Sequence, residues 1–390
     1  MKHQFKIIVV FVCILLSNPF AYGTEDNDLS KAIDSLFDNR EGRPGCAVGV
    51  INNGEYIHKR GYGLANLEHN ISIDENSIFR IGSISKQFTA MAIAILEEKG
   101  LLAFDDEMQK HIPDLIDYGE EVTINQMIHH FSGLGDYEDM DYPGRFKNAV
   151  DEEFRWGNED YLTNKEFYAL IKTLPLFRKP ERKFWYSNAG YALLTLVAQN
   201  VSGLNLRELA ERDIFKPLAM NDTFFNDDVN LIIKNRADGY SPIKGKPSQY
   251  KINMTNLSWV GDGGVHTSLN DFIKWDQNFY DNKLGAAEVS LIKTMEKTYA
   301  ETKVKKRNQK MSREQENQRT YAFAQNLAYY NGYKRWSHSG SWVGYLAHYT
   351  RFPELSFSTA VFCNTNEIDA TMIADNIVDL FFKMKQESSD

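Results

Sequence analysis

The sequence predicts an α+β fold, an α/β sandwich in which an antiparallel sheet is built from both chain ends, with flanking helices and a large, mostly helical inserted subdomain. Runs with strand character gather over residues 46–60 and again over residues 321–363, and turn dipeptides interrupt both groups. Between the two groups, apolar side chains recur mainly at helical spacing. We therefore expect residues 24–82 and 321–390 to form the sheet region and residues 83–320 to form the mostly helical region.

The first strand group is a predicted β-hairpin. Its two runs, Cys46–Ile51 and Tyr56–Arg60, are joined through Asn53-Gly54. Both residues of that dipeptide accept positive φ, which the tight turns of hairpins require. This is a strong short-range signal for two adjacent antiparallel strands.

The second strand group lies near the C-terminus, where Asn331-Gly332 and a turn around Pro353 separate apolar runs. After the last run, apolar residues from Ile368 to Phe381 recur at helical spacing, which predicts an amphipathic terminal helix. The predicted strands are Tyr321–Tyr329, Tyr333–His338, Leu346–Phe352 and Phe357–Cys363.

Several segments between the strand groups have the signals of helices. Ser83–Lys99 is apolar on nearly every side and stops at Gly100, which predicts a helix buried in the core. Thr123 and Gln126 have the spacing of a capping box. The polar stretch Lys303–Arg319 is expected to be a solvated loop. The other predicted helices are Thr123–Phe131, Tyr191–Gln199 and Leu206–Phe215.

The N-terminus has the pattern of a secretory signal. A short basic start is followed by an unbroken apolar run over residues 7–16 and by small residues before position 24. We expect residues 1–23 to be a signal peptide, residues 24–390 to be the mature domain, and the protein to be exported to the periplasm or secreted. No later apolar run approaches the about 20 residues of a membrane span, so the mature chain is expected to lack a transmembrane segment.

The charge and the cysteines narrow the classes of function. The net charge is −9, and acidic residues are spread along the chain, which disfavours nucleic-acid binding because a phosphate backbone needs a basic face. Zinc-ligand spacings such as H-E-x-x-H and C-x-x-C are absent, so we expect no metal and no cofactor.

Beyond the predicted signal peptide, Cys46 and Cys363 remain, each in a strand-like run. Two buried thiols are the favoured interpretation, with one disulfide as the alternative.

Ser83 and Lys86 form an S-x-x-K motif. Residues three apart share one face of a helix, so the Lys86 amine can reach the Ser83 hydroxyl and take its proton. At the start of a helix the Ser83 backbone N–H is also free to bind an oxyanion. The motif by itself is weak, and only Ser83 follows a glycine at the mouth of a long apolar helix. Chance matches occur at Ser241/Lys244, Ser248/Lys251 and Ser290/Lys293.

Tyr186 and Asn188 form a second candidate element. Side chains two apart in an extended segment project to the same side, so a phenol and an amide could enter one cleft. A tyrosine beside a lysine can serve as a base, and the Asn188 amide can grip a substrate amide. Without the other elements, Tyr186 would be read as a packed aromatic residue beside Trp185.

The third element is His338-Ser339-Gly340-Ser341, expected at the end of one strand and before the next. A strand edge there could present backbone groups to an extended substrate, and Gly340 permits close approach. The Ser341 N–H could be a second oxyanion donor beside that of Ser83. Without the other elements, His338 would be read as a structural histidine.

These three elements, in this order, resemble the motifs of the β-lactamase and penicillin-binding protein superfamily, and the Y-x-N form of the second resembles the class C branch. The resemblance spans roughly Gly45 to the C-terminus and implies a β-lactamase/transpeptidase-like fold. Supporting stretches are Ile81-Gly82 with Gln87–Ala90, His130–Leu134, Ile214–Met220, and Gly263-Gly264 before Thr267-Ser268.

Three positions depart from the family pattern. His338 replaces the lysine of K-T-G, as in D-Ala-D-Ala carboxypeptidase-like, D-aminopeptidase-like and some esterase-like members. A histidine offers a weaker positive charge at pH 7 than lysine, which disfavours efficient β-lactam hydrolysis because the family uses this position to anchor a substrate carboxylate. Phe131 stands where threonine is usual, and Ala219 where glycine is usual.

The resemblance implies a serine hydrolase of the carboxypeptidase, β-lactamase or esterase type. Ser83 would attack an amide or ester carbonyl, Lys86 and Tyr186 would move the proton, and water would release the acyl-enzyme. The expected partner is a small-molecule or short-peptide substrate, with a D-amino-acid peptide favoured and a β-lactam or a small ester open. A penicillin-binding sensor that is acylated without turnover is the alternative from a different class of function.

Overall fold

The structure is a computed structural model of the 390-residue chain, and it describes residues 22–137, 162–286, 291–302 and 320–387. Most of the predicted leader and the predicted loop Lys303–Arg319 lie outside these ranges.

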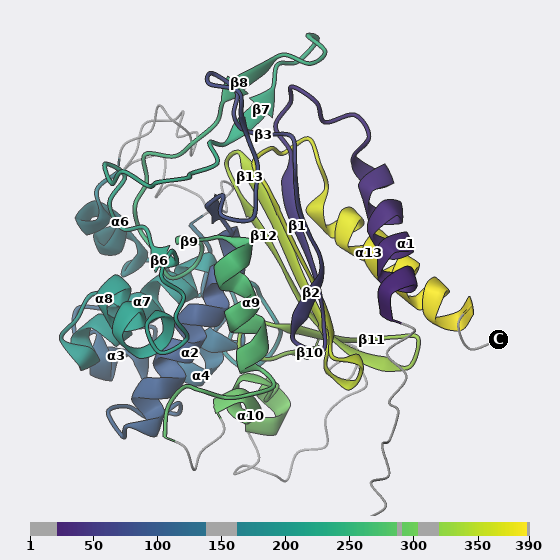
Figure 1. The fold of residues 1–390 in the computed structure, drawn as a ribbon. Helices are drawn as coiled ribbons and strands as arrows, with labels where there is room; N and C mark the ends of the chain where they lie inside the picture. The colour runs from purple at the N-terminus through teal and green to yellow at the C-terminus, as the bar shows by residue number, and fades with distance from the viewer. Residues whose placement is uncertain (1–21, 138–161, 287–290, 303–319, 388–390) are drawn as a thin grey trace, which may run out of the picture.

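A seven-stranded antiparallel sheet forms the centre of the fold, in the order β10-β11-β12-β13-β14-β1-β2. Strand β1 pairs with β14, so the two ends of the chain meet in the middle of the sheet (Figure 1). This arrangement confirms the predicted fold class. The strands are β1 (Cys46–Asn52), β2 (Glu55–Tyr62), β10 (Thr320–Tyr321), β11 (Asn326–Tyr330), β12 (Tyr333–Trp342), β13 (Tyr345–Phe352) and β14 (Phe357–Cys363).

The two predicted Asn-Gly turns are present where the sequence placed them. Asn53 and Gly54 have φ values of 51° and 81° between β1 and β2. Asn331 and Gly332 join β11 to β12 in the same way, with φ values of 49° and 82°. Because these residues tolerate positive φ, the local sequence is sufficient to place both turns.

Two strand boundaries differ from the prediction. The run Tyr321–Tyr329 is two strands, because the chain turns at Ala324, where φ is 57° and the Ala322 N–H donates to the Gln325 carbonyl. Strand β12 continues through Trp342, so His338 and the three residues after it lie within a strand rather than at its end. Pairing with β13 extends it, with Trp342 opposite Tyr345.

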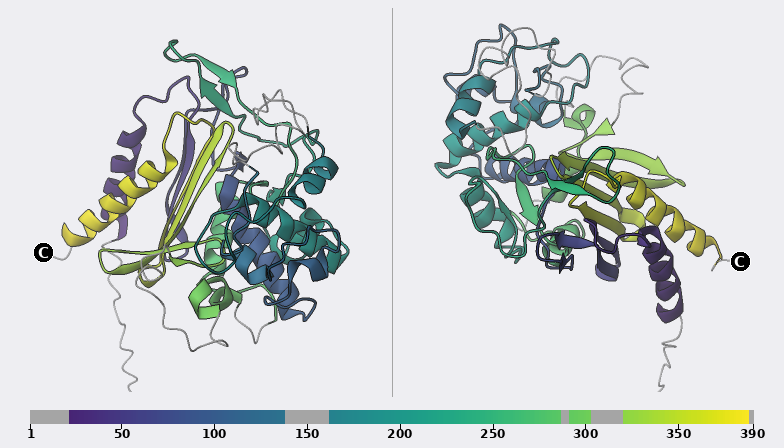
Figure 2. Two further views of the ribbon diagram at one scale, coloured as in Figure 1. Left: turned by 180° about the vertical axis from the view of Figure 1, so that it is seen from behind. Right: turned by 90° about the horizontal axis from the view of Figure 1, so that it is seen from above.

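Two helices cover the outer face of the sheet, α1 (Tyr22–Asp34) and α13 (Ala370–Glu387), as Figures 1 and 2 show. The predicted terminal helix is thus confirmed as α13. It packs Ile373, Ile377 and Val378 against the sheet in a separate apolar cluster. Met372, which the apolar spacing had included, is 54% exposed and points away from that cluster.

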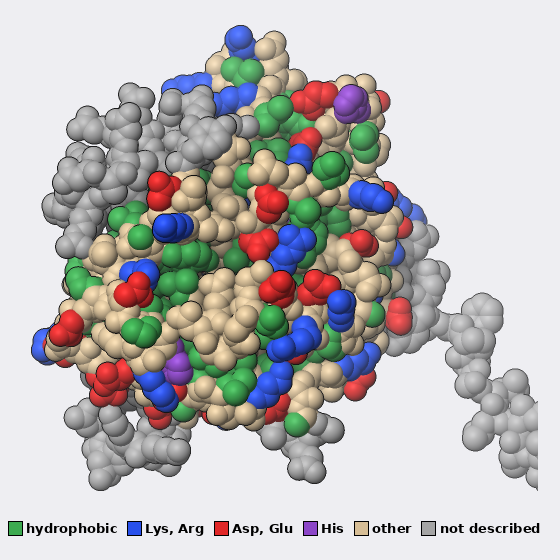
Figure 3. Space-filling view, turned by 90° about the vertical axis from the view of Figure 1, so that its left-hand side faces the viewer, with side chains coloured by type: hydrophobic (Ala, Val, Ile, Leu, Met, Phe, Trp, Pro, Cys, Tyr) green, Lys and Arg blue, Asp and Glu red, His purple; other side chains and the backbone are tan. Residues whose placement is uncertain are grey.

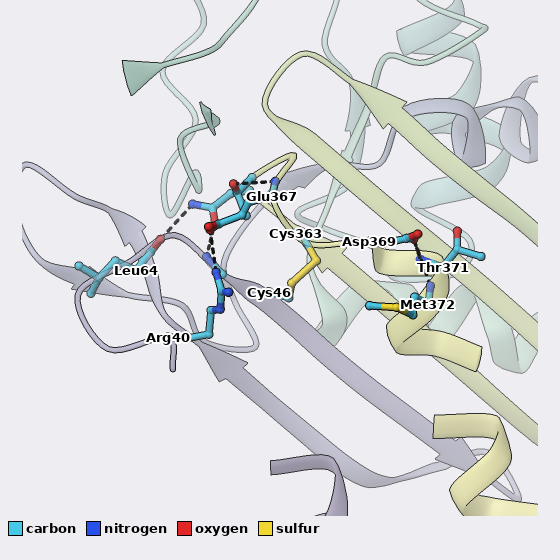
Figure 4. The surroundings of a disulfide bond; sticks show 11 residues. Arg40, Cys46, Leu64, Cys363, Glu367, Asp369, Thr371 and Met372 are labelled. Atoms are coloured by element: carbon cyan, nitrogen blue, oxygen red, sulfur yellow. Dashed lines mark hydrogen bonds and ion pairs between the residues drawn. A yellow bond between two sulfur atoms is a disulfide. The ribbon is translucent and has the colours of Figure 1, made fainter. Parts of the chain in front are cut away.

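A disulfide bond joins Cys46 to Cys363, so the favoured interpretation of two separate buried thiols was wrong (Figure 4). The two residues are directly opposite each other in the β1–β14 pair, with Cα atoms 4.0 Å apart. The register of strands 317 residues apart in sequence decides this pairing. Next to it, Arg40 and Glu367 form an ion pair that links the segment before β1 to the one after β14.

The inner face of the sheet carries the helical region, at the left of Figure 1, around the buried helices α2 (Lys86–Glu98) and α7 (Asn188–Ser202). Figure 3 shows positive and negative side chains interspersed on the face of this region. The remaining helices are α3 (Met108–His111), α4 (Ile124–Ile128), α6 (Asn164–Ile171), α8 (Leu206–Ala210), α9 (Leu269–Asn278), α10 (Leu291–Met295) and α11 (Tyr299–Thr302).

Short strands and turns connect these helices. Strand β5 pairs with β9, and β9 pairs with β6; two further pairs are β3 with β4 and β7 with β8. The short strands are β3 (Leu64–Asn66), β4 (Ile71–Ser72), β5 (Phe79–Arg80), β6 (Phe224–Phe225), β7 (Tyr240–Pro242), β8 (Tyr250–Ile252) and β9 (Val265–Thr267). Short helical turns are η1 (Ser35–Phe37), η2 (Gly82–Ser85), η3 (Glu211–Phe215) and η5 (Pro353–Leu355).

The predicted helices exist, but several boundaries shift. The capping box of Thr123 and Gln126 is present at the start of α4. Helix α2 begins three residues after the predicted start, because Ser83 lies in the 3₁₀ turn η2. Helix α7 begins at Asn188 rather than Tyr191, because the Ser187 side chain accepts from the Gly190 N–H and caps it.

Within the described ranges, no helix combines the length and the apolar character needed to cross a membrane.

Candidate active site

Ser83 and Lys86 lie at the junction between the turn η2 and the helix α2. Side chains three residues apart eclipse each other in a 3₁₀ turn, so the Lys86 side chain lies over Ser83 more directly than an α-helix would place it. Lys86 Nζ donates to Ser83 Oγ over 3.0 Å. Ser83 is half-buried and open to a pocket, whereas Lys86 is fully buried.

The Lys86 amine has two further partners, both of them oxygen atoms that only accept. Nζ lies 2.6 Å from the Asn188 side-chain oxygen and 2.6 Å from the Asp262 carbonyl oxygen. An amine with two N–H bonds satisfies both and leaves one position on nitrogen for the Ser83 hydroxyl. This position can accept a proton from Ser83 or donate one to it, which is the property that a proton carrier requires.

Asn188 has a contact that the sequence did not indicate, while its predicted contact with a substrate stays a prediction. Its side-chain oxygen binds Lys86, and its backbone N–H donates to Asp136 over 2.7 Å at the start of α7. Asn188 also lines the pocket. Its first role in the structure is to orient the amine, and the side chain lies close enough to the pocket to contact a substrate as well.

Asp262 was not singled out from the sequence, although it directly precedes Gly263-Gly264. Its carboxylate accepts from the Tyr137 hydroxyl and is buried near Lys86 and Arg80. Burial raises the pKa of this carboxyl, and the Lys86 and Arg80 charges oppose that rise. Asp262 thus contacts the amine through its backbone carbonyl, while its side chain is held by Tyr137.

Tyr186 lies beside Lys86, with Lys86 Nζ 5.0 Å from the centre of the phenol ring. His130 packs against the ring from one side at 4.2 Å between centroids, and His338 lies 6.2 Å away. Ser83 and Tyr186 line the same pocket. The structure thus brings the phenol ring of Tyr186, which is far away in the sequence, next to Ser83 and Lys86.

Close approach of two glycines brings strand β12 against the turn that holds Ser83. A Cβ atom on Gly340 would lie 1.9 Å from the Ile81 carbonyl oxygen and 3.3 Å from the Ser83 nitrogen. A Cβ atom on Gly82 would lie 2.5 Å from the Ser341 nitrogen. The backbone nitrogens of Ser83 and Ser341 are therefore neighbours, as two donors to one oxyanion must be.

His338 differs from the expectation that it offers a weak positive charge. Its Nε2 lies 2.9 Å from the Tyr321 hydroxyl and its Nδ1 lies 2.6 Å from the Ser339 carbonyl oxygen. Burial, with Lys86 close by, lowers the pKa of His338 to about 3. The imidazole is neutral at pH 7, and no signal in the sequence indicated its partner Tyr321.

The predicted residues surround one cavity of about 670 Å³. Lys86 lies behind its wall, and Gly340 lies within the strand that forms its edge. Aromatic side chains add further walls, among them Trp185 and Trp342. The predicted residues that line it are Ser83, Tyr186, Asn188, His338, Ser339 and Ser341.

The structure also accounts for the two other departures from the family pattern. Ala219 has a φ of 57°, the left-handed region that favours glycine, which explains why glycine is usual there. Phe131 stacks on Tyr299 with 4.3 Å between ring centroids. At this position a contact between two rings therefore takes the place of the hydroxyl that threonine would offer. Among the described residues, no group of three or more His, Cys, Asp or Glu side chains could hold a metal ion.

Comparisons with known proteins agree with this geometry. A penicillin-binding protein of Bacillus subtilis (strain 168) is 26% identical over 245 residues, which cover 59% of this chain and 51% of the relative. A D-aminopeptidase of Gluconobacter oxydans (strain 621H) is 29% identical over 238 residues, which cover 60% of this chain and 42% of the relative. The chain thus spans about half the length of the curated relatives it matches.

A solved structure shares the fold over nearly the whole chain. It is the octameric penicillin-binding protein homologue from Pyrococcus abyssi, with a TM-score of 0.74, 26% identity, and coverage of 92% of this chain and 77% of that one. The family profile described as Beta-lactamase matches residues 33–381. Because that match covers most of the chain, the protein belongs to the Beta-lactamase family.

Proposed function

We propose that this protein is an exported serine hydrolase that forms an acyl-enzyme on Ser83 and acts on an amide or an ester. The observation that carries the proposal is the 3.0 Å contact between Lys86 Nζ and Ser83 Oγ, with both other Lys86 contacts made to obligate acceptors. A lysine held in this way behind the wall of a pocket, next to a serine that lines it, is suited to activating the serine hydroxyl.

In the first step the Ser83 oxygen attacks the substrate carbonyl, and its proton passes to Lys86 Nζ. A bond from Oγ to the carbonyl carbon forms and the carbonyl oxygen becomes an oxyanion, which the N–H groups of Ser83 and Ser341 stabilise. Two such donors contribute about 3 to 4 kcal/mol each to the transition state. The carbonyl then re-forms, and the bond from its carbon to the leaving nitrogen or oxygen breaks. Tyr186 gives its phenol proton to the leaving atom, and the proton on Lys86 Nζ replaces it, so both groups return to their starting states.

In the second step water attacks the acyl-enzyme. The same groups carry its proton back to Ser83 Oγ, and the acid product leaves. No metal takes part in this scheme, since the lysine and the phenol supply the proton transfer and the backbone supplies the charge stabilisation.

The favoured substrate is a D-amino-acid peptide or a related small amide. The pocket is large enough for one or two residues, with polar backbone edges on β12 and aromatic walls. One matching relative is named a D-aminopeptidase. A β-lactam and a small ester are the alternative substrates, because the same acyl-enzyme chemistry applies to them.

Export is part of the proposal. The start of the chain has the pattern of a signal peptide, and Cys46 and Cys363 form a disulfide between the adjacent strands β1 and β14. Disulfides persist in oxidising compartments such as the periplasm and the extracellular space. Fractionation of cells that express the full chain tests this point.

Labelling with a fluorophosphonate, followed by intact-mass analysis and peptide mapping, tests the nucleophile. We expect one adduct on Ser83, and we expect Ser83→Ala to lose labelling and at least about 10³-fold in kcat/KM on the preferred substrate. Ser248→Ala is the matched control, because Ser248 belongs to a chance S-x-x-K match and lies exposed near β8. Full activity of Ser83→Ala would show that the nucleophile is wrong.

A second candidate is a penicillin-binding protein that is acylated and does not turn over. The matching relative in Bacillus subtilis, named a penicillin-binding protein, favours it. Stoichiometric labelling by a fluorescent penicillin that persists for hours supports this candidate. Sustained release of product from any of the three substrate classes excludes it.

A further inference from the structure

A chain of hydrogen bonds runs along the wall of the pocket through two histidines and one tyrosine, and Tyr321 and His338 line the pocket directly. The backbone N–H of Ser187 donates to Nδ1 of His130 over 3.2 Å, and Nε2 of His130 lies 3.3 Å from the Tyr321 hydroxyl. That hydroxyl lies 2.9 Å from Nε2 of His338, whose Nδ1 lies 2.6 Å from the Ser339 carbonyl oxygen. These hydrogen bonds join the segment before α7 to strand β12.

The groups at the two ends of this hydrogen-bond chain determine which ring nitrogens carry the protons. A backbone N–H can only donate, so Nδ1 of His130 accepts and its ring proton is on Nε2, facing Tyr321. A carbonyl oxygen can only accept, so Nδ1 of His338 carries a proton and its neutral ring offers the Nε2 lone pair. Tyr321 therefore accepts from His130 and donates to His338, and every donor has an acceptor.

A proton on His338 Nε2 does not fit this arrangement. It would direct a second N–H at the Tyr321 oxygen and turn the Tyr321 proton away from His338. The environment opposes it too, because burial lowers the pKa of both histidines and the Lys86 charge adds to the effect. Among the described residues, the titratable side chains near His338 on the inner face are Lys86 from α2, Tyr186 from the segment before α7, Tyr321 from β10 and His130, none of them a carboxylate. His348 from β13 acts from the opposite face of the sheet, where it contacts Thr371.

We propose that Tyr321 determines substrate specificity: together with the Ser339 carbonyl it occupies both nitrogens of His338. The described lining of the pocket then offers no cation to a carboxylate, and the site selects substrates whose leaving group is uncharged. This inference rests on the proposed function. It separates amides, peptide amides and neutral esters from substrates that end in a free carboxylate next to the scissile bond.

The other described residues of the pocket support the proposal. None of those that line it is a lysine or an arginine, and Asp136 adds a carboxylate. Lys86 lies behind the wall, where its amine already contacts three oxygen atoms. A carboxylate on the leaving group would therefore lose water without gaining an ionic partner, which costs binding free energy.

Two matched esters test the proposal: N-acetyl-D-alanyl-D-lactate and the corresponding D-lactamide, which differ only in a carboxylate and a carboxamide. We expect the wild-type protein to prefer the carboxamide by at least about tenfold in kcat/KM, roughly the effect of one missing charged hydrogen bond. The carboxylate is ionised throughout pH 5.5–8. We expect the preference to stay within about twofold over this range, because His338 stays neutral.

Two variants then change the charge at position 338 or the hydroxyl that contacts His338. His338→Lys supplies a fixed cation, and we expect it to shift the preference toward the carboxylate by about tenfold. Tyr321→Phe keeps the ring and leaves His338 Nε2 without its hydroxyl partner. A bound carboxylate can then favour a proton on Nε2, so the preference for the carboxamide should narrow, and more at pH 5.5 than at pH 8. Tyr330→Phe, which removes a hydroxyl on the outer side of the sheet next to Asp379, is the control and should leave the preference unchanged.

The wild-type measurement does not depend on how well the variants fold. Equal or better turnover of the carboxylate, or a preference that changes tenfold across pH 5.5–8, would overturn the proposal, because His338 would then act as a titrating cation. If neither ester is turned over but a fluorophosphonate labels Ser83, protection from labelling by each ester measures the same preference. If Ser83 is not labelled at all, the proposed function fails, and this inference fails with it.

Discussion

On the outer face of the central sheet, α1 and α13 cover a cluster made almost entirely of apolar side chains and one disulfide, whereas the inner face buries Lys86, Asp262 and His338. Apolar burial on the outer face stabilises the fold without requiring a partner for each atom. Buried polar groups on the inner face require hydrogen bonds and charges in fixed positions.

The difference separates stability from chemistry. A change on the outer face should lower the free energy of unfolding and leave the rate constants of the folded protein intact. A change on the inner face should alter activity, and its effect on stability should depend on which polar atom loses its partner. The following predictions test this separation, beginning with the largest expected effect.

Gly340→Ala should damage both properties, because β12 and the turn η2 meet at this glycine. The new Cβ would lie 1.9 Å from the Ile81 carbonyl oxygen, so the strand must move away from Ser83. We expect a loss of about 1–3 kcal/mol in stability and of about 100-fold in kcat, since one oxyanion donor is displaced. Urea denaturation and steady-state kinetics measure the two effects.

Gly332→Ala is the control for that substitution. Its Cβ would meet nothing within 4 Å, although its φ of 82° is strained for alanine. We expect a loss of about 1 kcal/mol in stability and no change in kcat. Wild-type kcat in Gly340→Ala would contradict the proposed position of the oxyanion donors.

Replacing both cysteines by alanine removes the bond between β1 and β14. We expect a loss of about 2–5 kcal/mol in the free energy of unfolding, because the unfolded chain is no longer closed into a long loop. Below the unfolding transition, kcat/KM should equal that of the wild type, since the bond faces the outer cluster. Reduction of the wild-type protein should reproduce the effect, and a drop in kcat/KM of folded protein would show that the two faces are coupled.

Ile377→Ala tests the outer cluster without touching the disulfide. Ile377 is fully buried between α13 and the sheet, and its truncation should cost about 2–4 kcal/mol. Met372→Ala on the same helix should cost less than about 0.5 kcal/mol, because Met372 is 54% exposed. Equal losses in the two variants, measured by thermal or urea unfolding, would contradict the assigned face of α13.

Acid should destabilise the inner region through its buried neutral histidines. Burial, with Arg80 nearby, lowers the pKa of His266 to about 3, below the ordinary value near 6.5. The neutral ring therefore contributes stability fully above pH 6.5, and this contribution is lost as the pH falls toward 3. At pH 5 the loss amounts to about 2 kcal/mol.

His266→Gln should remove that part of the pH dependence. The difference between the free energies of unfolding at pH 7.5 and pH 5 should shrink by about 2 kcal/mol. His69→Gln, at an exposed position between β3 and β4, should leave the difference unchanged. An unchanged pH dependence in His266→Gln would show that this histidine does not stay neutral at pH 5.

Local patterns predicted the elements well, and their boundaries less well. The two Asn-Gly turns and the capping box at Thr123 are present as predicted, because their signals lie within four residues. The start of α7 was placed three residues late, since the capping role of Ser187 was hidden in a motif interpreted as extended. The strand β12 was predicted too short, because its last residues pair with β13 and have no strand signal of their own.

By itself, the sequence determined the turns, the helical and strand periods, and the spacing of Ser83 and Lys86, because each depends on dihedral preferences or on neighbours within one turn of chain. Only the tertiary structure decided that Cys46 pairs with Cys363, that Asn188 and Asp262 hold the Lys86 amine, and that Tyr321 takes the lone pair of His338. These contacts join segments from 17 to 317 residues apart in the chain. Strand register, the packing of α2 against α7 and the packing of η2 against β12 set their distances, and no local pattern in the chain encodes these.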